Sequence, residues 1–185
     1  MGQPAGSSVD RGNYRFDDDA VPKGRPRVIQ VSLPLPIQDR MQQALRRTRQ
    51  REIGGILMGR QIAAGRFEVV DFSLDELSGE RAHFVRDADH HREVLERFFE
   101  RTCHEYQKFN YLGEWHSHPG FPAAPSLTDL RSMQELVEGE REIDFAVLLI
   151  VKLGFLRRFI ASATLHRRGL APAPIRLIST EESHP

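Results

Sequence analysis

Hydrophobic positions repeat at strand spacing and helix spacing in turn along most of the chain. Residues 27–33 alternate as in a strand, and Ile37, Met41 and Leu45 then follow a helical period within residues 37–52. The same reading predicts a strand pair at 53–62 and 66–74, a helix at 88–108, a strand at 111–118, a helix at 126–140, strands at 145–153 and 155–166, and a short edge strand at 175–179. This order predicts an α/β fold, with helices packed against a mixed β-sheet.

The length of the chain indicates a single domain. Its 185 residues fall within the range of ~100–200 residues that one domain usually occupies. Residues 1–26 combine Gly, Ser, Pro and charged residues without a sustained period, so we expect a flexible arm there. The domain is then expected at 27–180, with a surface loop at 75–87 and a C-terminal tail at 181–185.

Composition excludes several classes of protein. Lys and Arg total 26 and Asp and Glu total 26, so no net charge favours nucleic acid or an anionic membrane. No stretch approaches the ~18 apolar residues that a membrane span requires. The single cysteine, Cys103, cannot form an internal disulfide and is expected to be at least half-buried. We therefore expect a cytoplasmic protein that binds neither nucleic acid nor membrane.

Candidate metal ligands are concentrated in one segment. His116 and His118 alternate on a predicted strand, so both imidazoles should project from the same face. Asp129, at the start of the next predicted helix, could add a carboxylate oxygen. Three such ligands suit a zinc ion with an open fourth position. Taken separately, the histidines could be ordinary surface residues, and Ser126 with Asp129 an ordinary helix capping box.

The combined spacing resembles the JAMM motif of the JAB/MPN metalloprotease family. HSHP at 116–119 is followed after six residues by Ser126 and after two more by Asp129, as in that motif. The segment EIGGILMG beginning at Glu52 is similar to the family segment that bears the catalytic glutamate. The resemblance covers roughly residues 28–165 and implies a JAB/MPN-type, deaminase-like fold.

The resemblance also implies an activity and a role for each matching residue. It implies one zinc ion per chain, held by His116, His118 and Asp129. Glu52 would be the general base and acid, and Ser126 would stabilise the oxyanion. The expected reaction is zinc-dependent hydrolysis that removes a ubiquitin-like protein from conjugates or trims its C-terminus.

The segment YLGEWHSHP further resembles the corresponding segment of bacterial JAB proteins that are encoded with ubiquitin-activating-like and ubiquitin-conjugating-like enzymes in antiphage operons. The expected partners are therefore a ubiquitin-like protein or its conjugates, and such operon-encoded enzymes. Two alternatives stay open. One is a metal-free MPN scaffold that only binds partners, and the other is a JAB peptidase that processes sulfur-carrier proteins or small peptides.

Glycines near the motif suggest how a substrate would be held. Gly54 and Gly55 weaken a predicted strand, which indicates close approach of another backbone or of a ligand. The proline-stiffened loop with Gly120 and Phe121 lies next to the second histidine. We expect these four residues to contact substrate, leaving little room, so that small residues precede the cleaved bond.

Neighbouring residues are assigned by alternation along the strand. Trp115 should face the core, on the side opposite the histidines, whereas Glu114 should share their face and is the next candidate for the general base. His166 is expected at the surface or in a supporting position around the site.

Overall fold

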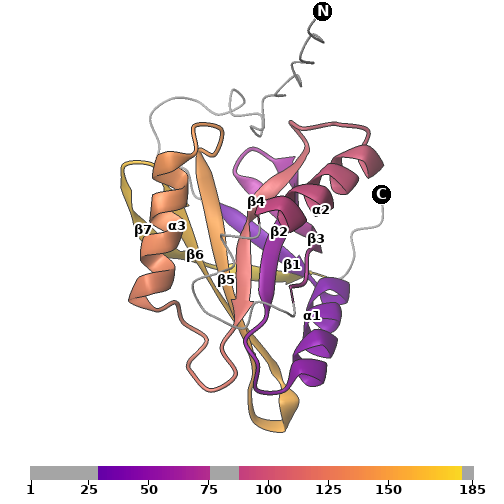
Figure 1. Ribbon diagram of the computed structural model, residues 1–185, viewed down its shortest axis with the longest axis vertical. Helices are drawn as coiled ribbons and strands as arrows, with labels where there is room; N and C mark the ends of the chain where they lie inside the picture. The colour runs from indigo at the N-terminus through magenta and orange to yellow at the C-terminus, as the bar shows by residue number, and fades with distance from the viewer. Residues whose placement is uncertain (1–28, 76–87, 181–185) are drawn as a thin grey trace, which may run out of the picture.

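The computed structural model describes residues 29–75 and 88–180. Within this part of the chain, eight strands form one sheet in the order β7-β6-β5-β4-β2-β3-β1-β8 (Figure 1). The strands are β1 (Gln30–Pro34), β2 (Gly54–Ala63), β3 (Arg66–Phe72), β4 (Phe109–Ser117), β5 (Phe145–Leu153), β6 (Phe159–Arg167), β7 (Leu170–Ile175) and β8 (Leu177–Thr180). The helices are α1 (Leu35–Thr48), α2 (Ala88–Arg101) and α3 (Leu127–Gly139), with a 3₁₀ turn at Phe155–Arg157.

The sheet is mixed, as predicted. Strand β4 runs parallel to β5, and β1 runs parallel to both β3 and β8. The pairs β2–β3, β2–β4, β5–β6 and β6–β7 are antiparallel. Strand β5 lies in the interior of the sheet and is buried from Ala146 to Val151, which explains its uninterrupted apolar sequence. The predicted fold class, an α/β single domain, is confirmed.

Helix α1 covers one face of the sheet. Its periodic residues Ile37, Met41 and Leu45 belong to the larger core cluster, together with alternate residues of the strands. Trp115 is part of this cluster, is 1% exposed and donates its indole N–H to the carbonyl of Ser73 at 2.9 Å. Trp115 therefore faces the core on the α1 side, as alternation predicted.

Helices α2 and α3 pack on the opposite face (Figure 1). Met133 and Val137 of α3 meet Leu148 of β5, while Phe98 and Phe99 of α2 meet Met58 of β2. Two separate apolar clusters result on this face. The histidines of β4 belong to the same face, so the start of α3 lies close to them.

Both of the first two helices end earlier than the hydrophobic period predicted. Helix α1 ends at Thr48, because Arg49 adopts a positive φ of 56°. Helix α2 ends at Arg101 rather than near residue 108, and Cys103 and His104 take φ values of 53° and 57°. Cys103 is consequently exposed, contrary to expectation. Tyr106 lies beyond the end of α2 but still packs against the ring of Phe99. Its spacing therefore made the hydrophobic period look helical beyond Arg101.

Other differences lie at the start of α3 and in the last third of the chain. The helical period of 126–140 would place Leu127 on the buried side of α3, but this residue is 73% exposed and occupies the first position of the helix. Residues 155–157 form a turn, so the predicted strand 155–166 begins only at Phe159. Strand β7 was not predicted, and the predicted edge strand 175–179 corresponds to β8 at the far edge of the sheet.

The expected arm at 1–26, most of the loop 75–87 and the tail 181–185 lie outside the described residues. Among the described helices, none is long and apolar enough to cross a membrane.

Candidate metal centre

The end of β4, an interior strand of the sheet, carries the two histidines. His116 lies in the strand, and His118 follows its last residue, with its backbone N–H donating to the carbonyl of Val151 in β5 at 2.9 Å. Their Nε2 atoms lie 3.1 Å apart. The alternation of side chains along the strand therefore produces the predicted pair of imidazole nitrogens aimed at one point.

Asp129 reaches the same point from the first turn of α3. Its Oδ1 lies 3.5 Å from Nε2 of His116, and its Oδ2 lies 3.6 Å from Nε2 of His118. Ser126 caps the helix, because its Oγ accepts the Asp129 N–H at 3.2 Å while Oδ2 of Asp129 accepts the Ser126 N–H at 2.6 Å. The capping box therefore forms, and it also orients the carboxylate toward the histidines.

The separations between these ligand groups suit a zinc ion. Tetrahedral zinc with bonds of ~2.0–2.1 Å places neighbouring ligand atoms roughly 3.3 Å apart. The two Nε2 atoms lie 3.1 Å apart, and each has one oxygen of Asp129 nearby, Oδ1 at 3.5 Å from His116 and Oδ2 at 3.6 Å from His118. Nδ1 of His118 lies 3.1 Å from the carbonyl of Pro122. As the donor in that bond, Nδ1 carries the proton and Nε2 keeps the lone pair that a metal needs. His116, His118 and Asp129 can thus hold one metal ion with a position left open.

The pKa values of two acidic residues at or near the ligand cluster, Asp129 and Glu114, are shifted in opposite directions. Burial raises the pKa of Asp129, but hydrogen bonds from His116 and Ser126 and the charge of His116 outweigh burial and hold this pKa below its usual range. Asp129 is therefore ionised at neutral pH, as a metal ligand must be. Burial raises the pKa of Glu114 to about 7, against the opposing effect of His116.

Glu52 lies just before β2, at the same end of the paired strands as the histidines. Ile53 is held against β4 by two bonds with Ser117, from the Ser117 N–H to the Ile53 carbonyl at 2.8 Å and from the Ile53 N–H to the Ser117 Oγ at 3.0 Å. The register pairs Gly54 with His116. Continuing that register brings the backbone of the half-buried Glu52 to the level of His118. Its role as general base stays a prediction.

The two glycines of β2 are explained by packing within the protein. A Cβ on Gly54 would lie 2.4 Å from the carbonyl oxygen of Trp115 and 2.9 Å from Cβ of His116. A Cβ on Gly55 would lie 2.4 Å from the carbonyl oxygen of Ser73. Both glycines are buried. Of the two explanations that the sequence left open, close approach of another backbone is the one observed, and a substrate contact at Gly54 and Gly55 has no support from these positions.

The loop after the histidines is less crowded than expected. A Cβ on Gly120 would meet nothing within 4 Å, so the space beside it is open. Phe121 is half exposed, and its ring makes an edge contact with the ring of His118 at 6.3 Å between centroids. Gly120 and Phe121 therefore border the metal centre at the surface, where a substrate could approach.

Sequence reasoning missed several residues that support the centre. Ser117 was not assigned a role, although strand alternation points its hydroxyl away from the ligands and toward Ile53. The Pro122 carbonyl and Lys152, whose Nζ donates to the carbonyl of Phe121, carried no motif signal. His166 is completely buried in β6, with no hydrogen-bond partner for either ring nitrogen among the described residues. The expectation of a surface or supporting role for His166 is therefore wrong.

Comparisons with known proteins agree with this fold. The solution structure of a protein from Desulfitobacterium hafniense, a structural genomics target, is similar with a TM-score of 0.62 and 21% identity, covering 83% of this chain and 94% of that chain. At this identity the likeness shows the fold alone. No curated protein matches the chain. Residues 34–162 match the family of prokaryotic homologs of the JAB domain, and the chain therefore belongs to the JAB domain family.

Proposed function

We propose that the protein is a JAMM-type zinc isopeptidase or peptidase that acts on a ubiquitin-like protein. The observation that carries the proposal is the convergence of His116, His118 and Asp129 on one point, with spacing that suits tetrahedral zinc. Glu52 lies just before β2, and Ser126 caps α3 between His118 and Asp129 in the sequence. The JAB fold and this donor set together support hydrolysis better than a metal-free scaffold role.

A zinc ion held here would supply a water with a pKa near ~7 and would polarise the scissile carbonyl. Glu52 would accept the proton of the attacking water and return it to the departing amine, a contribution of typically ~10²–10⁴-fold. The hydroxyl of Ser126 accepts the Asp129 N–H and also hydrogen-bonds the Asp129 carboxylate, so it would turn its hydrogen from that carboxylate to donate to the oxyanion. The helix cap holds Asp129, and the Pro122 carbonyl of the loop orients His118.

The proposed substrate is the C-terminal tail of a ubiquitin-like protein joined to a lysine side chain or to a short peptide. We expect such a tail to be extended where it reaches the centre at the ends of β2 and β4, with small residues before the cleaved bond. Open space beside Gly120 offers an entry. The proposal includes activating-like and conjugating-like enzymes as pathway partners and a cytoplasmic location.

The test uses the zinc-loaded protein and a ubiquitin-like protein linked through its C-terminus to a lysine side chain. Glu52→Gln should retain zinc but lose at least ~10²-fold in kcat/KM, because an amide cannot transfer the proton. His116→Ala should lose both zinc and turnover. The matched comparison substrates carry a bulky residue before the bond or are unrelated unfolded proteins.

Each outcome of this test has a defined meaning. Cleavage of the conjugate alone, with loss in Glu52→Gln, supports the proposal. Equal cleavage of all substrates shows a general protease, and cleavage of short linear peptides alone favours a precursor-processing peptidase. A protein that binds no zinc and cleaves nothing would be a scaffold.

A further inference from the structure

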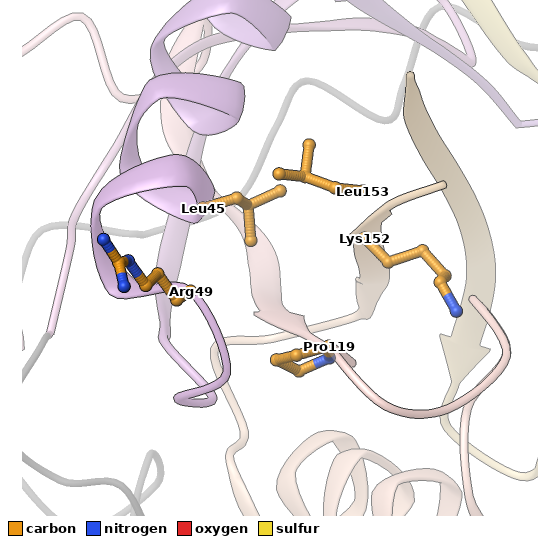
Figure 2. A pocket seen from close by; sticks show the side chains of 5 residues that line it. All are labelled: Leu45, Arg49, Pro119, Lys152 and Leu153. Atoms are coloured by element: carbon orange, nitrogen blue, oxygen red, sulfur yellow. The ribbon is translucent and has the colours of Figure 1, made fainter. Parts of the chain in front are cut away.

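Lys152 is tied to the metal centre by a chain of contacts through the loop that follows β4. This residue lies near the end of β5, and its Nζ donates to the carbonyl of Phe121 at 2.5 Å. Figure 2 shows its side chain extending toward the loop that follows Pro119. The carbonyl of the next residue, Pro122, lies 3.1 Å from Nδ1 of His118. Lys152 thus holds the peptide adjacent to the one that orients a proposed metal ligand.

The backbone attaches the same loop to β5 at a second point. The N–H of His118 donates to the carbonyl of Val151, the residue immediately before Lys152. Phe121 N–H also approaches the carbonyl of His118 at 3.4 Å. Prolines restrict the backbone of this loop, so fixing the Phe121 carbonyl leaves the Pro122 carbonyl little freedom. Two successive residues of β5 therefore determine where the acceptor for His118 Nδ1 lies.

We propose that Lys152 is a positioning residue for the metal centre, which fixes the loop so that the Pro122 carbonyl holds His118 in the tautomer with its proton on Nδ1 and its lone pair on Nε2. Outer partners of this kind typically change metal affinity by ~10–100-fold when they are removed. The inference rests on the metal site of the proposed function and does not depend on the hydrolytic reaction.

If only charge repulsion mattered, removing the Lys152 charge would change the zinc affinity in the opposite direction. This difference makes the inference testable. A lysine cation close to a zinc site repels the metal, so removing the charge should strengthen zinc binding if charge were its main effect. If Lys152 positions His118, the loss of its bond to Phe121 should weaken zinc binding. The direction of the change in affinity therefore separates the two effects.

The experiment compares Lys152→Met, Lys152→Arg and Lys108→Met by titration of the chelator-treated proteins with zinc. We expect Lys152→Met to bind zinc roughly 10-fold more weakly, and Lys152→Arg to recover most of the affinity because it can still donate to the Phe121 carbonyl. Lys108 is a matched control, since it is exposed, contacts Glu105 and precedes the opposite end of β4. Its replacement should leave zinc affinity unchanged.

Imidazole nitrogen NMR of the metal-free proteins provides a readout that does not depend on zinc. His118 of the parent protein should be protonated on Nδ1 under mildly alkaline conditions, whereas Lys152→Met should shift part of the population to the Nε2-protonated tautomer. Unchanged or tighter zinc binding in Lys152→Met, or an unchanged tautomer, would overturn the inference. A parent protein that binds no zinc would contradict the proposed function, while the tautomer measurement would still decide the role of Lys152.

Discussion

Gly54 lacks a side chain because the carbonyl of Trp115 and Cβ of His116 occupy the space that one would need. The residue is buried between β4 and the bridge to Asp75, whose N–H donates to the Gly54 carbonyl at 2.8 Å. Any side chain here must displace backbone of β4 or the base of the His116 side chain. Packing at this one position is therefore coupled to the placement of a proposed metal ligand.

Gly54→Ala should weaken both folding and zinc binding. The added methyl group overpacks a buried strand, which typically lowers the free energy of unfolding by ~1–3 kcal/mol. Displacement of His116 should raise the zinc dissociation constant in the same variant. Urea unfolding and zinc titration measure the two effects, with Gly120→Ala as the control, because nothing lies within 4 Å of a Cβ there. An unaltered stability and affinity in Gly54→Ala would show that β4 adjusts without cost.

His166 gives the stability of the protein a dependence on acidic pH. Burial lowers the pKa of His166 from 6.5 to about 4, because the imidazolium would lose its hydration in the core. Between these values the unfolded chain takes up a proton and the folded chain does not. The stabilising contribution is therefore complete above pH 6.5 and is lost as the pH falls toward 4.

Replacing His166 with Leu should remove this dependence. The parent protein should lose on the order of 3 kcal/mol of unfolding free energy across this acidic range from His166 alone, whereas His166→Leu should not. Chemical unfolding of chelator-treated protein at a series of pH values measures the difference between the two curves. His104→Asn is a suitable control, because His104 is exposed and asparagine tolerates its positive φ. Parallel curves for the parent and His166→Leu would show that the core admits the imidazolium.

At the scale of single elements, the start of a helix and the two faces of a strand could be predicted where a single residue or simple alternation determines them. Ser126 marked the start of α3 because its hydroxyl caps the helix, and the alternation in β4 placed the histidines and Trp115 on opposite faces. The end of α2 was not predictable from periodicity. Tyr106 packs on Phe99 from a turn, so its spacing mimics another helical position.

The turn at 155–157 shows a second limit of pattern reading. Phe155 and Leu156 are 87% and 85% exposed, and Leu156 and Arg157 have positive φ values of 54° and 59°. The sequence pattern predicts a strand here because it shows that these residues are apolar. It does not show whether they are buried against the sheet or exposed in a turn. The bond from Gln42 to the carbonyl of Arg157, which holds the turn against α1, joins residues 115 positions apart and carries no sequence signal.

Across the whole molecule, the proposed metal ion would join the end of β4 to the start of α3. His116 and His118 lie at the end of β4, an interior strand of the sheet, whereas Asp129 belongs to α3, which packs against β5 further along the helix. The motif spacing predicted the ligands, but only the fold shows that they bridge sheet and helix. Since the ligand cluster requires both elements in place, the unfolded chain should not bind zinc in the same way.

Zinc should therefore stabilise the folded protein, at about one ion per chain. A ligand that binds only the native state adds ~4 kcal/mol to the free energy of unfolding at a free concentration 1,000-fold above its dissociation constant. We expect chelation to lower the Tm and added zinc to restore it, as measured by thermal unfolding together with elemental analysis. His116→Ala should abolish the zinc-dependent part of the Tm, while His104→Asn should keep it, because His104 lies outside the ligand cluster. A Tm that is indifferent to chelation, in a protein that elemental analysis shows to have lost its zinc, would mean that the ion does not link α3 to the sheet.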